Sequence, residues 1–212
     1  AIGGSSAGVY IHNRPMVASL FRGIPPERFE QVRNLFLDIG REMGVPLEIA
    51  NDGDVAALAG SMSLGDGAVL GLAMGSSQAA GYVTPDGGMT GWLNELAFAP
   101  VDYSPQAPAE EWSGDRGCGA SYLSQQCVFR LAGEAGIHIP VDLSPARKLA
   151  FVQERLEAGH AGAIRIWQSM GVYLAYAIAH YAEFYEIRHV LLLGRCTSGA
   201  AGQLIWTRCG EC

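Results

Sequence analysis

The sequence predicts an α/β fold, and three observations predict it. Short apolar runs of strand length alternate with longer segments in which apolar residues recur at helical spacing. One unit is clear, with an apolar run at 16–21, a helix after Pro25-Pro26 and a strand at 45–49. The composition, 49% hydrophobic and 17% charged over 212 residues, is that of a globular protein with a sizeable core. Strand, helix and strand in this order favour a parallel sheet.

The elements predicted in the first part of the chain follow each other closely. The first ten residues read as the end of a strand and a turn. A helix is expected after the proline pair, because the apolar residues that follow recur at helical spacing: Phe29, Val32, Leu35, Phe36 and Ile39. Gly44 ends this helix, the strand 45–49 follows, and a second helix covers 55–61.

Small and turn-forming residues at 63–67 place a lobe boundary there, with lobes at 1–64 and 65–212. The second lobe opens with an apolar run at 68–73 and two strands that we expect to be joined through Pro85-Asp86-Gly87-Gly88, a hairpin signal. A loop rich in proline and serine follows at 100–119. The remaining predicted elements are helices at 121–135 and 145–158, a long helix within 164–185, a strand at 189–193 and a final helix near Ala200.

The bulk composition excludes several classes of protein. The formal charge is −7 and no Lys/Arg cluster occurs, so no nucleic-acid partner is expected. The most hydrophobic window, 164–185, contains Arg165, Gln168, His180 and Glu183, and it therefore reads as a buried helix rather than a membrane span. No secretory signal opens the sequence, and five irregularly spaced cysteines do not make a disulfide framework. Cytoplasm is the expected compartment.

The segment at 45–60 is the most informative part of the sequence. Its apolar strand stops at Asn51-Asp52-Gly53-Asp54 and turns into an Ala-rich helix. A carboxylate at such a junction lies beside unpaired backbone N–H groups, where the helix dipole favours negative charge. This geometry suits a general base that faces a bound hydroxyl group. It equally suits a helix N-cap, and Asp54 competes with Asp52 for that position.

The order of motifs along the chain resembles that of the ROK family of sugar kinases, repressors and related open reading frames. The segment NDGDVAALAG, residues 51–60, is similar to the family's NDANAAALGE signature. A Gly/Ser turn follows a strand within 69–83, and Gly91-Trp-Leu-Asn-Glu95 is similar to the family's GxxGExGH motif. The segment 114–118 resembles the cysteine-rich stretch, and 189–194 resembles the nucleotide-side strand with its glycine. The resemblance covers nearly the whole chain.

This resemblance implies a fold, an activity and site residues. The fold would be ribonuclease-H-like, of the actin/hexokinase/Hsp70 type, with two lobes and a cleft between them. The activity would be phosphoryl transfer from ATP, with Mg²⁺, to a hydroxyl of a hexose or N-acetylhexosamine. Asp52 would be the base, Asn51 and Glu95 would be sugar ligands beside it, and all three are expected on one wall of the cleft. We also allow for a homodimer.

Several positions depart from the family's pattern. Phe98, Glu111 and Ser113 stand where the family has zinc ligands, and of that set only Cys118 is kept, so we expect no zinc. Ala120 replaces a further glutamate. The family's phosphate turn G-T-G-x-G is matched by 75–79. Gly75, Ser76, Ser77 and Gly194 are the predicted phosphate and nucleotide positions.

Side chains at Ser77 and Ala79, where the family has glycine, are expected to hinder phosphate binding, because glycine allows close backbone approach and left-handed φ angles. Arg195 stands in place of a second glycine after the nucleotide-side strand, where it could reach a phosphate or lie at the surface. The end pair Cys209 and Cys212 has CxxC spacing but no second pair, so chance explains it best.

Two functions therefore remain open from the sequence. In the family, a hairpin of the D-x-G-x-T type binds phosphate, and no such hairpin precedes Asn51 here. Compared with the family, the sequence therefore looks shortened at both ends. The first hypothesis is a glucokinase-like sugar kinase in which Asp52 is the base. The second is a sugar-binding or regulatory relative whose phosphate machinery has decayed, with little or no turnover of ATP. A repressor's effector domain is a third option, and it would need a helix-turn-helix that this sequence lacks.

Overall fold

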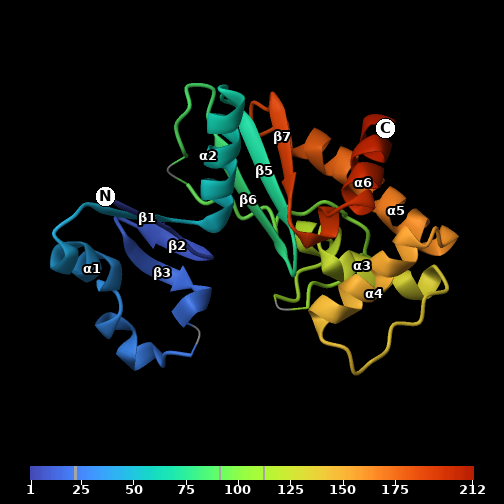
Figure 1. Cartoon of the computed structure of the whole chain (residues 1–212), viewed down its shortest axis with the longest axis horizontal. Helices are drawn as coiled ribbons and strands as arrows, with labels where there is room; N and C mark the ends of the chain where they lie inside the picture. Colours follow the sequence, from blue (N-terminus) through green and yellow to red (C-terminus); the bar gives the residue numbers. More distant parts are fainter. Residues whose placement is uncertain (22, 91, 112) are drawn as a thin grey trace. The chain divides into compact units, whose positions relative to one another are not determined.

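The chain folds into two compact units, each of which is described here by itself. The computed structural model describes residues 1–21, 23–90, 92–111 and 113–212. One unit comprises residues 1–71 and 81–94, and the other comprises 72–80 and 95–212. Figure 1 shows the order of the elements along the chain. The lobe boundary expected between residues 64 and 65 rests on the small and turn-forming residues at 63–67, and it stays a prediction.

The first unit contains a small β hairpin, a parallel strand pair and two helices. The hairpin turn is made by His12 and Asn13, which both have positive φ angles, as a two-residue turn between right-twisted strands requires. The remaining non-regular part contains two short 3₁₀ turns. The elements are β1 (Ile2–Ser5), β2 (Gly8–Ile11), β3 (Arg14–Ala18), η1 (Ser19–Phe21), η2 (Pro26–Gln31), α1 (Leu35–Met43), β4 (Leu47–Ala50) and α2 (Asp52–Leu64).

Strand β4 is held on both sides. On one side it pairs in parallel with β1, from Ile2 opposite Leu47 to Ser5 opposite Ala50. On the other side the Asn13 side chain bonds to its backbone: Nδ2 donates to the carbonyl of Leu47 at 3.0 Å, and Oδ1 accepts from the amide of Ile49 at 2.9 Å. The end of β4, from which α2 starts, is thereby fixed in position.

Helix α2 packs directly on the backbone of two strands. A Cβ added at Gly81 in β6 (Gln78–Val83) would lie 2.2 Å from the carbonyl oxygen of Gly53, in the first turn of α2. A Cβ added at Gly71 in β5 (Val69–Met74) would lie 3.1 Å from the Cβ of Ala57. Both strand positions therefore need a residue without a side chain, because backbone and helix are already in contact.

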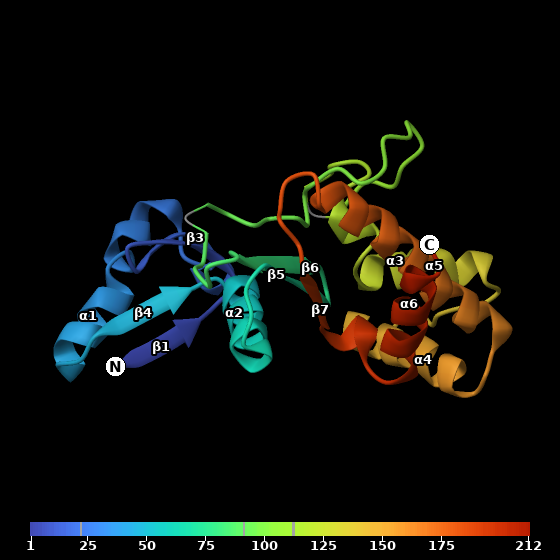
Figure 2. The same cartoon turned by 90° about the horizontal axis from the view of Figure 1, so that it is seen from above.

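Among the described residues, the second unit contains four helices and part of a three-stranded sheet, of which residues 69–71 and 81–83 belong to the first unit. Figure 2 shows these elements from a second side. The strands lie in the order β6-β5-β7, so β5 is central. Among the described residues, no helix combines the length and the apolar character that a membrane span needs. The elements are β5 (Val69–Met74), β6 (Gln78–Val83), η3 (Gly119–Ser121), α3 (Gln125–Glu134), α4 (Pro145–Glu157), α5 (Ala161–Tyr181), β7 (His189–Leu193), η4 (Arg195–Thr197) and α6 (Ala200–Gly210).

The core of this unit forms where α5 lies against α6. Gly171 of α5 allows the close approach, since a Cβ there would lie 2.7 Å from the carbonyl of Ile205. Trp167 is fully buried and its indole N–H donates to the carbonyl of Cys196 at 2.9 Å, which joins α5 to η4. The long apolar segment predicted within 164–185 is therefore a core helix, as expected.

The structure corrects three details of the predicted elements. The helix expected after Pro25-Pro26 is a 3₁₀ turn followed by a separate helix, α1. The helix expected at 55–61 begins three residues earlier, at Asp52, because Asn51 caps it. Strands β5 and β6 are joined through 75–77, whereas the segment at 85–88 follows β6 as a turn closed by a bridge between Val83 and Met89.

Replacing Gly81 by alanine should destabilise the first unit. The new methyl group would overlap the backbone of Gly53, and overpacking of this kind costs about 1–3 kcal/mol. The matched control is Gly133→Ala in α3, where a Cβ meets nothing within 4 Å and helix propensity should add about 0.5 kcal/mol. Denaturant unfolding of the three proteins measures both changes. Equal stability of Gly81→Ala and wild type would contradict the close packing of α2 on β6.

Candidate functional site at the start of helix α2

Asn51 is the N-cap of α2. Its backbone is extended, and its side-chain Oδ1 accepts a hydrogen bond from the amide of Gly53 at 2.8 Å. Its Nδ2 donates to the carbonyl of Gly8 at 2.9 Å, at the start of β2. Asn51 thus joins the helix to the hairpin, and its amide keeps capacity for one further donor and one further acceptor bond.

Asp52 is the first residue of α2, and its side chain is exposed. Its Oδ1 accepts from the amide of Gly53 at 3.2 Å, the same amide that Asn51 caps more closely. The N-cap alternative considered for Asp52 and Asp54 is therefore wrong, since Asn51 fills that position. Asp52 lies at the positive end of the helix dipole, a setting that favours a carboxylate.

Asp54, which the sequence presents only as a competing N-cap, is a half-buried carboxylate with hydrogen-bond partners. Its Oδ1 accepts from Nδ2 of Asn94 at 2.9 Å, and it also accepts from the backbone amide of Tyr82. Asn94 is itself buried and donates to the hydroxyl of Thr90 at 2.9 Å. Burial raises the pKa of Asp54, against the effect of these hydrogen bonds, and the charge of Asp52 raises it further. Tyr82 and Asn94 lie 28 and 40 residues further along the chain, so no local sequence pattern predicts these hydrogen bonds.

Glu95, the second predicted sugar ligand, belongs to the other unit. It directly follows Asn94, it is half-buried, and its carbonyl accepts from the amide of Phe98 at 3.2 Å. Gly91, which opens the motif predicted to contain Glu95, lies outside the described residues. Asn51 and Asp52 are neighbours in the sequence. That Glu95 lies with them on one wall of a cleft stays a prediction.

Ser77, one of the two side chains expected to hinder phosphate binding, causes no backbone strain in the turn 75–77. None of its residues has a positive φ angle, so Ser76 and Ser77 fit without cost, and both are exposed. The carbonyl of Gly75 accepts from the amide of Gln125, at the start of α3, at 2.9 Å. Any obstruction by the serines must therefore act on a ligand rather than on the backbone.

Gly194 lies against this same turn. A Cβ added there would lie 2.4 Å from the carbonyl oxygen of Met74, the residue before Gly75, and its φ of 96° with ψ of 169° is a conformation that glycine adopts almost alone. Sγ of Cys196 also lies 3.6 Å from the carbonyl oxygen of Gly75. The structure thus brings together Gly194 and the turn 75–77, which the sequence analysis grouped as phosphate positions.

The positions that correspond to the family's zinc ligands lie in two different environments. Cys118 is buried in a cluster with Ala97 and Ala120, against which Phe98 packs. Glu111 and Ser113 are exposed. In the described ranges no group of three His, Cys, Asp or Glu side chains could hold a metal ion. The expectation that zinc is absent remains a prediction.

The neighbouring loop depends on a carboxylate that the sequence reasoning missed. Glu110 is buried; its Oε2 accepts from the amide of Ser113 at 2.6 Å, and its Oε1 accepts from Nε2 of Gln126 at 2.8 Å. Glu110 stands beside exposed Glu111 in the sequence, and no local pattern tells the two apart.

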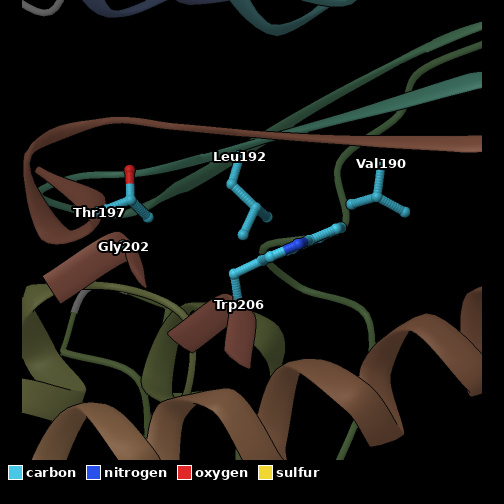
Figure 3. A pocket seen from close by; sticks show the side chains of 5 residues that line it. All are labelled: Val190, Leu192, Thr197, Gly202 and Trp206. Atoms are coloured by element: carbon cyan, nitrogen blue, oxygen red, sulfur yellow. The ribbon is translucent and has the colours of Figure 1, made fainter. Parts of the chain in front are cut away.

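An apolar pocket of about 260 Å³ lies between β7 and α6 (Figure 3). Figure 3 shows the ring of Trp206 facing the side chains of Leu192 and Val190, with Thr197 and Gly202 at the opposite end. No residue predicted for the site lines this pocket. The pocket adjoins Gly194, because the hydroxyl of Thr197 in its lining donates to the carbonyl of Gly194 at 2.8 Å.

Comparison with solved structures identifies the fold. The chain is similar to the ROK hexokinase from Thermus thermophilus, with a TM-score of 0.70 and 16% identity over 98% of this chain and 67% of that one. It is similar to a ROK family transcriptional regulator, a homologue of the E. coli MLC protein, with a TM-score of 0.69 and 18% identity over 100% of this chain and 53% of that one.

A third similar structure is the ROK family glucokinase from Streptomyces griseus in complex with glucose and AMPPNP, with a TM-score of 0.63 and 16% identity over 84% of this chain and 60% of that one. No family model and no curated protein matches the sequence. Likeness at such low identity establishes the fold, and it confirms the expected α/β fold of the actin/hexokinase/Hsp70 type. The chain spans between about half and two thirds of these proteins.

The stability of the protein relative to Asp54→Asn should fall as pH rises. The unfolded carboxyl ionises near its ordinary value of 3.8, and the folded one ionises at a higher pH. Between the two pKa values the folded state binds more protons, so rising pH removes stability from wild type but not from the variant. Urea unfolding of both proteins between pH 3.5 and 7 gives this difference. A relative stability that increases with pH would show that the folded pKa is lowered instead.

Proposed function

We propose that this chain belongs to the ROK family and has the activity of a sugar kinase, transferring a phosphoryl group from ATP to a sugar hydroxyl. Asp52 is the general base, Asn51 and Glu95 bind the sugar, and the sugar is a hexose or N-acetylhexosamine. The observation that carries the proposal is the setting of Asp52. It is an exposed carboxylate in the first turn of a helix whose cap is supplied by its neighbour Asn51.

The chemistry requires a carboxylate in a fixed position rather than one with a special acidity. In phosphoryl transfer to an alcohol, the base orients the hydroxyl and accepts its proton as the new P–O bond forms. Asp52 is fixed because β4 is held by β1 and by Asn13, and because α2 packs on Gly81. The Asp52 carboxylate accepts one long hydrogen bond, from the Gly53 amide, and therefore contributes little to the stability of the fold.

The phosphate side of the proposal rests on Gly194 and the turn 75–77. Glycine at 194 lets the backbone after β7 approach Met74 closely, and this places two exposed backbone segments side by side. Backbone N–H groups in such turns suit phosphate oxygens. When bound, ATP would supply the phosphoryl group, and Mg²⁺ would be held chiefly by phosphate oxygens and water rather than by a protein cage.

A sugar-binding protein without kinase activity is the second candidate, and a specific observation favours it. Ser76 and Ser77 place two side chains on the exposed turn where the family's pattern has Thr and Gly. Loss of one well-placed donor to a transferring phosphoryl group reduces the rate about a hundredfold or more. Sugar binding through Asn51, Asp52 and Glu95 would not depend on that turn.

Two measurements separate these candidates. Calorimetric titration with glucose and N-acetylmannosamine tests sugar binding, and a coupled assay tests sugar-dependent ADP release. For a kinase, we expect Asp52→Asn to reduce ADP release by about 10²–10⁴-fold, the usual contribution of a general base. Asp38→Asn on α1, an exposed aspartate remote in sequence, should leave both measurements unchanged.

Each pattern of results has one meaning. Sugar-dependent ADP release that disappears in Asp52→Asn supports the kinase. Sugar binding that weakens in Asp52→Ala, with no ADP release in wild type, supports the non-catalytic sugar-binding protein. Absence of binding to either sugar, together with absence of ADP release, would reject both candidates.

A further inference from the structure

A buried polar side chain lies directly behind the turn 75–77. Gln78, the first residue of β6, is 4% exposed, and neither atom of its amide has a partner in well-formed hydrogen-bond geometry. The amide faces the hydroxyl of Tyr181, which is 1% exposed. Burial raises the pKa of Tyr181 to about 12, and the contact with Gln78 offsets part of that effect. Buried amides without good partners are uncommon and need an explanation.

The Gln78 amide lies close to the segment that carries Glu95. A Cβ added at Gly119 would lie 2.2 Å from Oε1 of Gln78 and 2.4 Å from the carbonyl oxygen of Leu96. Gln78 and Leu96 therefore approach the same side of Gly119, where only a glycine fits. Because Leu96 follows Glu95 directly, the Gln78 side chain links the β5–β6 turn to the main chain beside Glu95.

A second chain of hydrogen bonds joins the same two places. The amide of Gln125 donates to the carbonyl of Gly75 at 2.9 Å. The hydroxyl of Ser124 donates to the carbonyl of Ala120 at 2.6 Å, and the amide of Ala120 donates to the carbonyl of Ala97 at 2.9 Å. This path begins in the turn and ends two residues after Glu95. Every residue on both paths belongs to the second unit.

We propose that Gln78 is a positioning residue that couples phosphate binding at the turn 75–77 to sugar binding at Glu95. The inference rests on the function proposed above. An amide that lacks good partners in one arrangement favours a second arrangement in which it gains them, and a small shift of the turn or of Leu96 is sufficient for that. A sugar held by Glu95 then orders the turn, and by linkage a phosphate group on the turn tightens sugar binding to the same degree.

Amide hydrogen exchange with and without sugar tests this coupling. In wild type, saturating glucose or N-acetylmannosamine should slow exchange at Ser76 and Ser77 by about fivefold or more, the usual range for coupled sites. In Gln78→Leu this slowing should vanish, while the sugar dissociation constant stays within about twofold and the thermal midpoint is not lowered. Gln203→Leu, on the exposed face of α6, is the matched control and should behave as wild type.

The outcomes distinguish failure of the coupling from failure of the proposed function. Sugar binding without slower exchange at the turn in wild type overturns the coupling and leaves the proposed function standing. Slower exchange that persists in Gln78→Leu also overturns it, because the hydrogen-bonded path through Gln125, Ser124 and Ala120 then carries the coupling without Gln78. Failure of both sugars to bind wild type overturns both proposals. If Gln78→Leu does not fold, Gln78→Met, a flexible apolar side chain of similar length, answers the same question.

Discussion

The Asn51 side chain is the interaction on which the candidate site depends most. One end of the amide caps α2 through Gly53, and the other end bonds to the carbonyl of Gly8. A single short side chain therefore fixes where the strand stops, where the helix begins and how the hairpin lies beside them. Asp52 needs no capping role of its own, and its carboxylate stays exposed at the positive end of the helix.

Glycine residues position other parts of the structure, because they allow chain segments to approach closely. Gly81 lets the first turn of α2 approach β6, Gly194 lets the backbone after β7 approach Met74, and Gly119 leaves room for the Gln78 amide. At Gly81 and Gly194 a main-chain segment, and not a side chain, is positioned. That suits a site whose proposed phosphate ligands are backbone N–H groups, because such groups can be placed only by placing the chain itself.

The sequence predicted an element best where its apolar residues form an unbroken run. The strand at 189–193 is a continuous apolar run and has the predicted bounds. The start of α2 was misplaced because Asn51, Asp52 and Asp54 are all good N-cap residues, and tertiary contact with Gly8 selects Asn51. A proline pair likewise signals a helix start but does not distinguish a 3₁₀ turn from an α-helix.

The candidate site was only partly accessible to sequence reasoning. The grouping of Gly194 with the turn 75–77 came from the resemblance, and the structure places them together. Asp54 and Gln78 could not be found, because their partners Asn94 and Tyr181 are distant in the sequence and neither pairing follows from a local pattern. Such residues become visible only when burial and hydrogen bonds are known.

The proposed function requires that Asp52 and Glu95 bind the same sugar molecule. Amide resonances of the isotopically labelled protein, followed during titration with glucose and with N-acetylmannosamine, test this requirement. The Asp52–Gly53 and Glu95–Leu96 amides should shift together, with one dissociation constant. Shifts confined to one of the two segments, or shifts at both with different dissociation constants, would contradict it.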